Sequence, residues 1–192
     1  MRLFAAVLPP DGAVRDLESA LGPLRALPDA DLLRWTGPET WHFTLAFLGE
    51  VGEELLPELG ERLGRAARRG GPFPLRIAGG GHFGGRALWA GARGDLPALR
   101  RLAERVRAAA GRAGAPPAEQ HHAYRPHLTL ARVRGPHAVD LRPYAAALAP
   151  LDGPAWQAAE LCLVRSHLPD GRTPGAGPRY EALARWPLGP GR

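Results

Sequence analysis

Two short stretches of the sequence each place a threonine two positions after a histidine. HFTL contains His42 and Thr44, and HLTL contains His127 and Thr129, a little under half the chain later. An unperturbed imidazole titrates near pH ~6.5, so two histidines can supply a general base and a general acid near neutral pH. Threonine hydroxyls can donate hydrogen bonds to phosphate oxygens. Together these groups predict displacement at phosphorus without a metal: a base for the incoming oxygen, an acid for the leaving oxygen, and donors for the oxygens that remain.

Both motifs lie in short apolar runs that predict β-strands. Residues 41–49 are rich in aromatic residues and end at a glycine, and residues 127–133 form a second such run. Residues two apart on a strand share a face, so each histidine should face the same way as its threonine. The apolar residues between them face the opposite side, where helices can cover them. Two such halves that face each other would bring both histidine–threonine pairs into one cleft.

The remaining segments place pairs of strands between helices. We expect strands at residues 2–8, 32–35, 73–83, 86–92, 156–168 and 179–188. We expect helices at residues 11–27, 52–69, 96–113 and 139–149. This order predicts an α+β protein with mostly antiparallel sheets. No linker divides the chain, so residues 1–192 are expected to form one domain and a monomer.

These motifs and the phrases around them resemble the 2H phosphoesterase superfamily, which is defined by two H-x-[TS]-x motifs. Within it, the chain resembles the RNA 2′,3′-cyclic phosphodiesterases, also called the 2′-5′ RNA ligase family. The likeness covers nearly the whole chain, in RLFAAVLPP, LRWTGPETWHFTLAFLGEV, FGGRALWAG, YRPHLTLARV and LVRSHLPDGR…RYEALARWPL. It implies a bilobal, pseudo-twofold fold with two antiparallel sheets backed by helices and an active-site groove between the lobes.

The resemblance also implies an activity, which is metal-independent hydrolysis of an RNA-terminal 2′,3′-cyclic phosphate to a 2′-phosphomonoester. It gives His42 the role of acid toward the 3′ oxygen and His127 the activation of water, with Thr44 and Thr129 binding the phosphate. The symmetry of the motifs leaves open which histidine is acid and which is base. The implied partner is RNA with cyclic phosphate ends, such as tRNA fragments, and no cofactor is implied. If an RNA 5′-hydroxyl replaced water, the same site would make a 2′-5′ linkage without ATP, as a side activity.

Three further residues are candidates for substrate binding. Arg132 matches a basic family position associated with phosphate or base contact. Simple alternation turns Arg132 away from His127, so it reaches the cleft only if the strand ends or bulges near Ala131. Arg125 and Tyr124 lie just before the second motif, and Tyr124 can stack on a base. Near the first motif, the aromatic residues Phe4, Trp41 and Phe47 are expected to pack in the core.

The composition permits a nucleic-acid partner but does not specify one. The formal net charge is +6, yet the chain has no lysine or asparagine, and its arginines are spread along the sequence, as in proteins from GC-rich genomes. We expect a cytoplasmic protein with no membrane partner, because the sequence shows no membrane span or signal peptide. The one cysteine, Cys162, is expected to be buried in a strand. His121 and His122 lie in a loop rich in proline and alanine, with no acidic or cysteine ligand at metal-binding spacing, so no metal site is expected.

Two alternatives remain open from the sequence. The same two histidines can act on another cyclic phosphate, such as ADP-ribose 1″,2″-cyclic phosphate or a cyclic nucleotide, because only the groove walls would differ. The chain can also be an RNA-binding module without catalytic activity. The first alternative differs from cyclic-phosphate hydrolysis on RNA in the substrate that is turned over. The second predicts no turnover and an RNA affinity that does not depend on the histidines.

Overall fold

The computed structural model describes residues 1–117, 124–169 and 177–190, and the strands in these ranges form two sheets. The strands are β1 (Arg2–Val7), β2 (Leu33–Trp35), β3 (Phe43–Glu50), β4 (Phe73–Phe83), β5 (Ala87–Gly94), β6 (Leu128–Val133), β7 (Trp156–Ala158), β8 (Glu160–His167) and β9 (Arg179–Pro187). The α-helices are α1 (Asp11–Leu21), α2 (Leu56–Arg68), α3 (Leu96–Arg112) and α4 (Arg142–Leu148). Short 3-10 helices are η1 (Leu24–Ala26), η2 (Ala30–Leu32), η3 (Pro38–Thr40) and η4 (Glu53–Leu55).

Each sheet carries one of the two motifs. Within the described residues, one sheet has four strands in the order β3-β1-β8-β9, and the other has five in the order β2-β6-β5-β4-β7. All of these pairings are antiparallel. The first motif leads into β3 and the second into β6. When β3 is matched with β6, the two sheets correspond in strand order, and β2 is an additional strand at the outer edge of β6.

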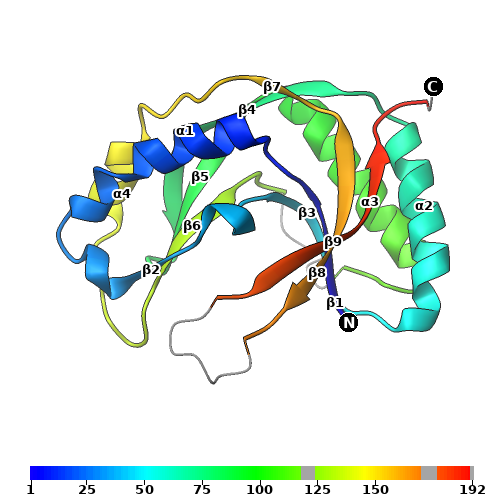
Figure 1. The fold of residues 1–192 in the computed structure, drawn as a ribbon, viewed down its shortest axis with the longest axis horizontal. Helices are drawn as coiled ribbons and strands as arrows, with labels where there is room; N and C mark the ends of the chain where they lie inside the picture. Colours follow the sequence, from blue (N-terminus) through cyan, green and yellow to red (C-terminus); the bar gives the residue numbers. More distant parts are fainter. Residues whose placement is uncertain (118–123, 170–176, 191–192) are drawn as a thin grey trace.

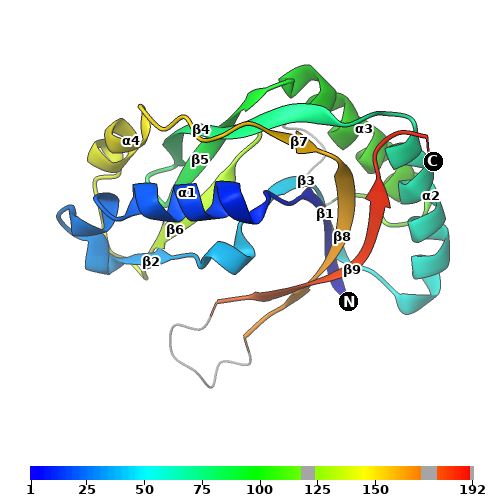
Figure 2. The ribbon, with the colours of Figure 1, turned by 45° about the horizontal axis from the view of Figure 1, so that its top comes forward.

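The helices gather at the two ends of the molecule (Figure 1). Helices α2 and α3 pack against each other and contact β9 and β3, while α4 contacts β4 and β5. Figure 2 shows α1 and α4 at one end, α2 and α3 at the other, and the strands between them. Leu59, Leu63, Leu99 and Val106 of α2 and α3 are fully buried. The apolar spacing that predicted these helices therefore faces the core.

Two predicted elements differ from the structure. The helix expected at 11–27 ends at Leu21, because Pro23 follows and lacks the N–H that a continued helix would donate. The strand expected at 156–168 is two strands in different sheets, since β7 pairs with β4 and β8 pairs with β1. Both pieces bury side chains, and neither glycine nor proline separates them in the sequence, so the change of sheet at Ala159 has no local signal.

The two lobes are also not the two halves of the sequence. Strands β8 and β9, from the end of the chain, complete the sheet that begins with β1. The two views show β1, β8 and β9 lying together (Figures 1 and 2). Segments from both ends of the sequence therefore build one sheet, and the expected α+β fold of two antiparallel sheets with helices is confirmed.

Candidate active site

Both motifs contribute to one cavity of about 1090 Å³. Its wall includes every site residue that the sequence predicted, namely His42, Thr44, Tyr124, Arg125, His127, Thr129 and Arg132. His42 directly precedes β3 and His127 directly precedes β6, so each imidazole lies where a strand begins. The cavity therefore takes one histidine and one threonine from each sheet.

His42 is fixed by the backbone and enclosed by two aromatic rings. Its Nδ1 lies 2.7 Å from the carbonyl oxygen of Thr40. A carbonyl only accepts hydrogen bonds, so Nδ1 carries the proton and Nε2 is left for reaction. The ring of Phe4 stacks on the imidazole with centroids 4.5 Å apart, and the ring of Tyr180 meets it edge-on at 5.2 Å.

This enclosure has a direct electrostatic consequence. Loss of water around the imidazole lowers the pKa of His42 from 6.5 to about 4, because the charged form is poorly solvated. The hydrogen bond to Thr40 opposes this fall in pKa, and the positive charge of His127 adds a smaller lowering. At neutral pH, His42 is therefore a neutral imidazole in the free protein.

His127 has the same backbone contact in different surroundings. Its Nδ1 lies 2.8 Å from the carbonyl oxygen of Arg125, so Nε2 is again the free nitrogen. The rings of Phe83 and Trp89 meet the imidazole edge-on, with centroids 4.9 Å and 6.3 Å away. The guanidinium of Arg125 lies over the Phe83 ring at 5.9 Å. A cation therefore accompanies His127, whereas His42 lies among uncharged rings.

Each strand that follows a histidine contains a β-bulge one residue after the threonine. In β3 the extra residue is Leu45, where the register against β1 shifts. In β6 the extra residue is Leu130, where the register against β5 shifts. A bulge of this kind reverses the alternation of side chains beyond it. The residue five positions after each histidine is thereby turned to the cavity side.

This reversal decides where Arg132 and Phe47 lie. Arg132 lines the cavity and is exposed, although simple alternation would turn it away from Thr129. Phe47 is the corresponding residue of β3, lines the same cavity, and is 44% exposed. The expectation that Phe47 packs in the core is wrong, because it ignored the bulge. Phe4 and Trp41 are buried as expected.

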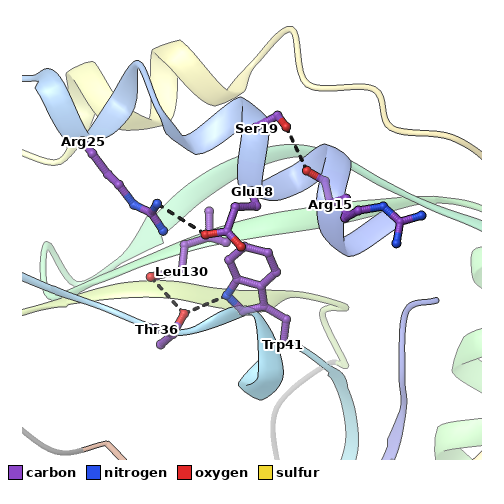
Figure 3. A network of polar contacts seen from close by, with 7 residues as sticks. All are labelled: Arg15, Glu18, Ser19, Arg25, Thr36, Trp41 and Leu130. Carbon is purple, nitrogen blue, oxygen red and sulfur yellow. Dashed lines mark hydrogen bonds and ion pairs between the residues drawn. The ribbon is translucent and has the colours of Figure 1, made fainter. Parts of the chain in front are cut away.

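One threonine outside the motifs joins the two half-sites (Figure 3). The hydroxyl of Thr36, at the end of β2, accepts a hydrogen bond from Nε1 of Trp41 at 2.9 Å. The same hydroxyl lies 2.8 Å from the carbonyl oxygen of Thr129 and 3.0 Å from that of Leu130. Thr36 N also donates to the Leu130 carbonyl at 2.9 Å. The residue before His42 is thus tied to the bulge that follows Thr129.

Arginine dominates the charge of the cavity wall. Among the residues that the structure describes, the lining arginines are Arg34, Arg107, Arg125, Arg132 and Arg179, and the lining carboxylate is Glu39. Tyr124 lies beneath the guanidinium of Arg107 at 5.8 Å, and burial raises the pKa of its hydroxyl. The wall is suited to a polyanionic ligand with an aromatic part.

Several of these wall residues have little or no signal in the sequence. Arg34 stands in the phrase LRWTGPETW just before the first motif, and that proximity was its only signal. Phe83 and Tyr180 come from β4 and β9, far from either motif in the chain. Their contact with the histidines arises from sheet order, which no local pattern reveals.

The other reactive side chains have simpler settings. Cys162 is buried in β8 as expected, and burial raises the pKa of its thiol. In the described ranges, no three His, Cys, Asp or Glu side chains gather to hold a metal ion. His121 and His122 lie outside the described residues. Among the helices that the structure describes, none is long and apolar enough to cross a membrane.

Sequence comparisons relate nearly the whole chain to one family. A family model for the 2′-5′ RNA ligase superfamily matches residues 9–170. The RNA 2′,3′-cyclic phosphodiesterase of Thermus thermophilus is 33% identical over 201 residues, which is 98% of this chain and 90% of the relative. That of Methanothermobacter thermautotrophicus is 33% identical, with 95% and 96% covered. The match to the Aeropyrum pernix enzyme, at 38% identity, spans 50% of this chain and 55% of that relative.

Solved structures show the same architecture. The Thermus thermophilus protein TT0787 has a TM-score of 0.73 and 31% identity, with 98% of both chains covered. Escherichia coli LigT in its apo form has a TM-score of 0.74 and 26% identity, with the same coverage. A LigT complex with 3′-AMP matches with a TM-score of 0.70 over 97% of this chain and 96% of that one. The predicted fold and family are therefore confirmed.

Proposed function

Because the chain belongs to the 2′-5′ RNA ligase superfamily, we propose that it hydrolyses the terminal 2′,3′-cyclic phosphate of RNA to a 2′-phosphomonoester. Relatives similar over almost their full length carry the name RNA 2′,3′-cyclic phosphodiesterase. We further propose that residues 1–192 act as one catalytic domain and as a monomer, since one cavity takes residues from both sheets.

One observation carries this proposal. Two imidazoles line the same cavity, and each presents Nε2 because a main-chain carbonyl holds its Nδ1. Each imidazole is accompanied by a threonine two residues later. A phosphate in this cavity would meet a proton acceptor, a proton donor and two hydroxyl donors, which is the set that in-line displacement uses.

The reaction is balanced with one water molecule. A neutral imidazole takes a proton from water while the water oxygen forms a bond to phosphorus. The bond between phosphorus and the 3′ oxygen breaks, and that oxygen takes a proton from Nε2 of the other histidine, which enters the step as an imidazolium and leaves it as a neutral imidazole. Thr44 and Thr129 donate hydrogen bonds to the non-bridging oxygens, which carry the negative charge throughout. The product keeps its phosphate on the 2′ oxygen.

The surroundings of His42 favour the base role for this residue. With its pKa lowered to about 4, His42 is neutral at pH 7 and ready to accept a proton. About one His42 in a thousand would carry the proton that an acid must donate. We therefore assign activation of water to His42 and protonation of the 3′ oxygen to His127. This is the reverse of the assignment that the family resemblance implies.

The remaining predicted residues bind the RNA. Arg132 and Arg125 supply positive charge for the RNA phosphates, and the ring of Tyr124 stacks on a base. When an RNA 5′-hydroxyl replaces water, the same proton transfers form a 2′-5′ linkage without ATP. Water is far more concentrated than RNA ends, so hydrolysis is the main reaction and ligation a side reaction.

The test uses an RNA oligonucleotide that ends in a 2′,3′-cyclic phosphate. Incubation with the protein in EDTA should give the 2′-phosphate, which chromatography separates from the 3′-phosphate. His42→Ala and His127→Ala should each lower the rate by about 10²–10⁴-fold. His167→Ala is the matched control, because its imidazole binds Glu181 at 2.8 Å and does not line the cavity.

The outcomes separate the competing functions. Product that persists in both cavity variants would overturn the two-histidine mechanism. If RNA is not hydrolysed, ADP-ribose 1″,2″-cyclic phosphate and cyclic nucleotides are the next substrates to assay. If RNA binds with an affinity that does not depend on either histidine, and none of these substrates is hydrolysed, the chain is a binding module.

A further inference from the structure

Two arginines of the cavity wall stand directly opposite each other. Arg34 of β2 and Arg132 of β6 are cross-strand partners. Partners of this kind point to the same face with Cβ atoms about 5 Å apart. Both arginines line the cavity. Neither guanidinium forms an ion pair with a carboxylate in the described part of the chain.

The backbone holds this pair of like charges in register. The neighbouring partners are Leu33 with Val133 and Trp35 with Ala131. Leu33, Val133 and Ala131 are buried, so a shift of one residue would carry apolar side chains into the cavity. Facing like charges destabilise a sheet, and an anion between them removes that repulsion. Guanidinium groups suit such an anion, because each can donate two parallel hydrogen bonds to phosphate.

The pair also lies close to the reacting centre. The bulge at Leu130 makes Thr129 and Arg132 neighbours on the cavity face, about 7 Å apart along the strand. The ring of Tyr180 meets His42 at 5.2 Å. Burial raises the pKa of the Tyr180 hydroxyl, and the positive charges of Arg132 and Arg34 oppose that rise. This separation of about 7 Å between Thr129 and Arg132 is comparable to the distance between adjacent phosphates of one RNA strand.

We propose that Arg34 and Arg132 together bind the phosphate on the 5′ side of the terminal nucleoside. This inference rests on the proposed function and defines its substrate class. The preferred substrate is an end that carries this additional phosphate, as an oligonucleotide or a 5′-phosphorylated nucleotide does. A nucleoside 2′,3′-cyclic phosphate with a free 5′-hydroxyl occupies only the site of the histidines and threonines.

The test compares two small substrates on the same protein. Adenosine 2′,3′-cyclic phosphate is assayed with and without a 5′-phosphate. In the wild-type protein the 5′-phosphate should raise kcat/KM by about tenfold or more, as expected for a charge-assisted contact. Arg34→Gln should reduce that gain to below about threefold. The ratio is taken within each variant, so a general loss of active protein cancels.

A matched control and a binding measurement complete the experiment. Arg93→Gln removes an exposed arginine of β5 that lies 3.8 Å from Asp152 and does not line the cavity, and it should keep the full gain. Calorimetry then compares adenosine 2′,5′-bisphosphate with adenosine 2′-phosphate. The bisphosphate should bind about tenfold more tightly to the wild-type protein, and Arg34→Gln should remove this advantage.

The two readouts distinguish the two proposals. Equal affinity for both nucleotides in the wild-type protein, or an advantage that survives Arg34→Gln, overturns the phosphate site. If neither cyclic substrate nor cyclic-ended RNA is turned over while the bisphosphate keeps its Arg34-dependent advantage, the proposed function fails and the phosphate site stands. Turnover without any effect of the 5′-phosphate leaves the function standing and overturns the site.

Discussion

The two half-sites share one backbone frame and differ in what surrounds it. In both, a carbonyl two residues before the histidine holds Nδ1, and a bulge follows the threonine. The β3 half-site is apolar, with Phe4 and Tyr180 against the imidazole and Phe47 after the bulge. The β6 half-site has Arg132 after its bulge, and β2 adds Arg34 along its outer edge.

This difference shows how the same backbone arrangement can place two histidines in different surroundings. The backbone fixes where each reacting nitrogen lies, and it does so in the same way on both sides. The neighbouring side chains decide how readily that nitrogen takes a proton and what is bound beside it. The apolar half-site lowers the pKa of its imidazole, whereas the charged half-site supplies the positive charge that the proposed phosphate site needs.

The largest expected effect separates the histidines by role. In a 2′,3′-cyclic phosphorothiolate, the leaving atom at the 3′ position is sulfur, and a thiolate leaves without a proton far more readily than an alkoxide. Because we assign the acid role to His127, His127→Ala should recover about 10²-fold or more of its lost kcat on this substrate. His42→Ala should recover little, since water still needs a base.

The oxygen substrate assayed beside the sulfur substrate provides the internal control. The measured quantity is the ratio of the two kcat values in each variant, which does not depend on the active fraction of protein. Recovery in His42→Ala rather than in His127→Ala would assign the acid to His42, as the family resemblance implies. The half-sites would then differ in surroundings without the division of labour proposed here.

A smaller effect, on the pH dependence of stability, tests whether water is excluded from the imidazole of His42 in the β3 half-site. The pKa of His42 is about 4 in the folded protein against 6.5 without burial, so between these values the unfolded chain binds more protons. Stability therefore falls as the pH drops through this range. Between pH 7 and pH 5, His42 alone should cost about 2 kcal/mol of unfolding free energy.

Urea unfolding at both pH values measures this cost. The wild-type protein should lose about 2 kcal/mol more than His42→Gln between pH 7 and pH 5. His167→Gln is the control, because His167 bonds to Glu181 at 2.8 Å outside the cavity lining, and the contribution of His42 should persist in it. Equal losses in the wild-type protein and His42→Gln would show that water reaches the imidazole.

The sequence predicted the features of the site that depend on neighbours along the chain. His42 and Thr44 line one wall because residues two apart on a strand share a face, and this holds without knowledge of the partner strand. The same alternation failed for Arg132 and Phe47, five residues after the histidines. A bulge depends on the register against β1 or β5, and a single strand does not reveal that register.

The pattern along a single strand could not predict the site residues that other strands contribute. Tyr180 reaches His42 because β9 and β8 join the sheet of β1 and β3. That order follows from the change of sheet at Ala159, where neither glycine nor proline marks a break in the sequence. Arg34 faces Arg132 only because β2 adds to the edge of β6. Sheet order is a property of the whole core, so no local pattern specifies it.

The smallest expected effect concerns the Thr36 hydroxyl, which ties Trp41 beside His42 to the bulge of β6. Thr36→Val keeps the shape of the side chain but removes the hydroxyl that serves Trp41 and the carbonyls of Thr129 and Leu130 (Figure 3). Nε1 of buried Trp41 then lacks its acceptor, so the unfolding free energy should fall by about 1–2 kcal/mol. A looser bulge should also lower kcat/KM by a few-fold, roughly a kcal/mol or less.

Ser19→Ala is the matched control for this last change, because the Ser19 hydroxyl is exposed and donates to the Arg15 carbonyl of its own helix at 3.0 Å (Figure 3). Its removal should change stability by less than about 0.5 kcal/mol and leave kcat/KM as in the wild-type protein. Suppose Thr36→Val loses stability but keeps its kcat/KM. The bulge is then held by the ladders with β2 and β5, which remain intact, rather than by the hydroxyl. The two half-sites would then be alike in how their backbone is held, and would differ only in the side chains around it.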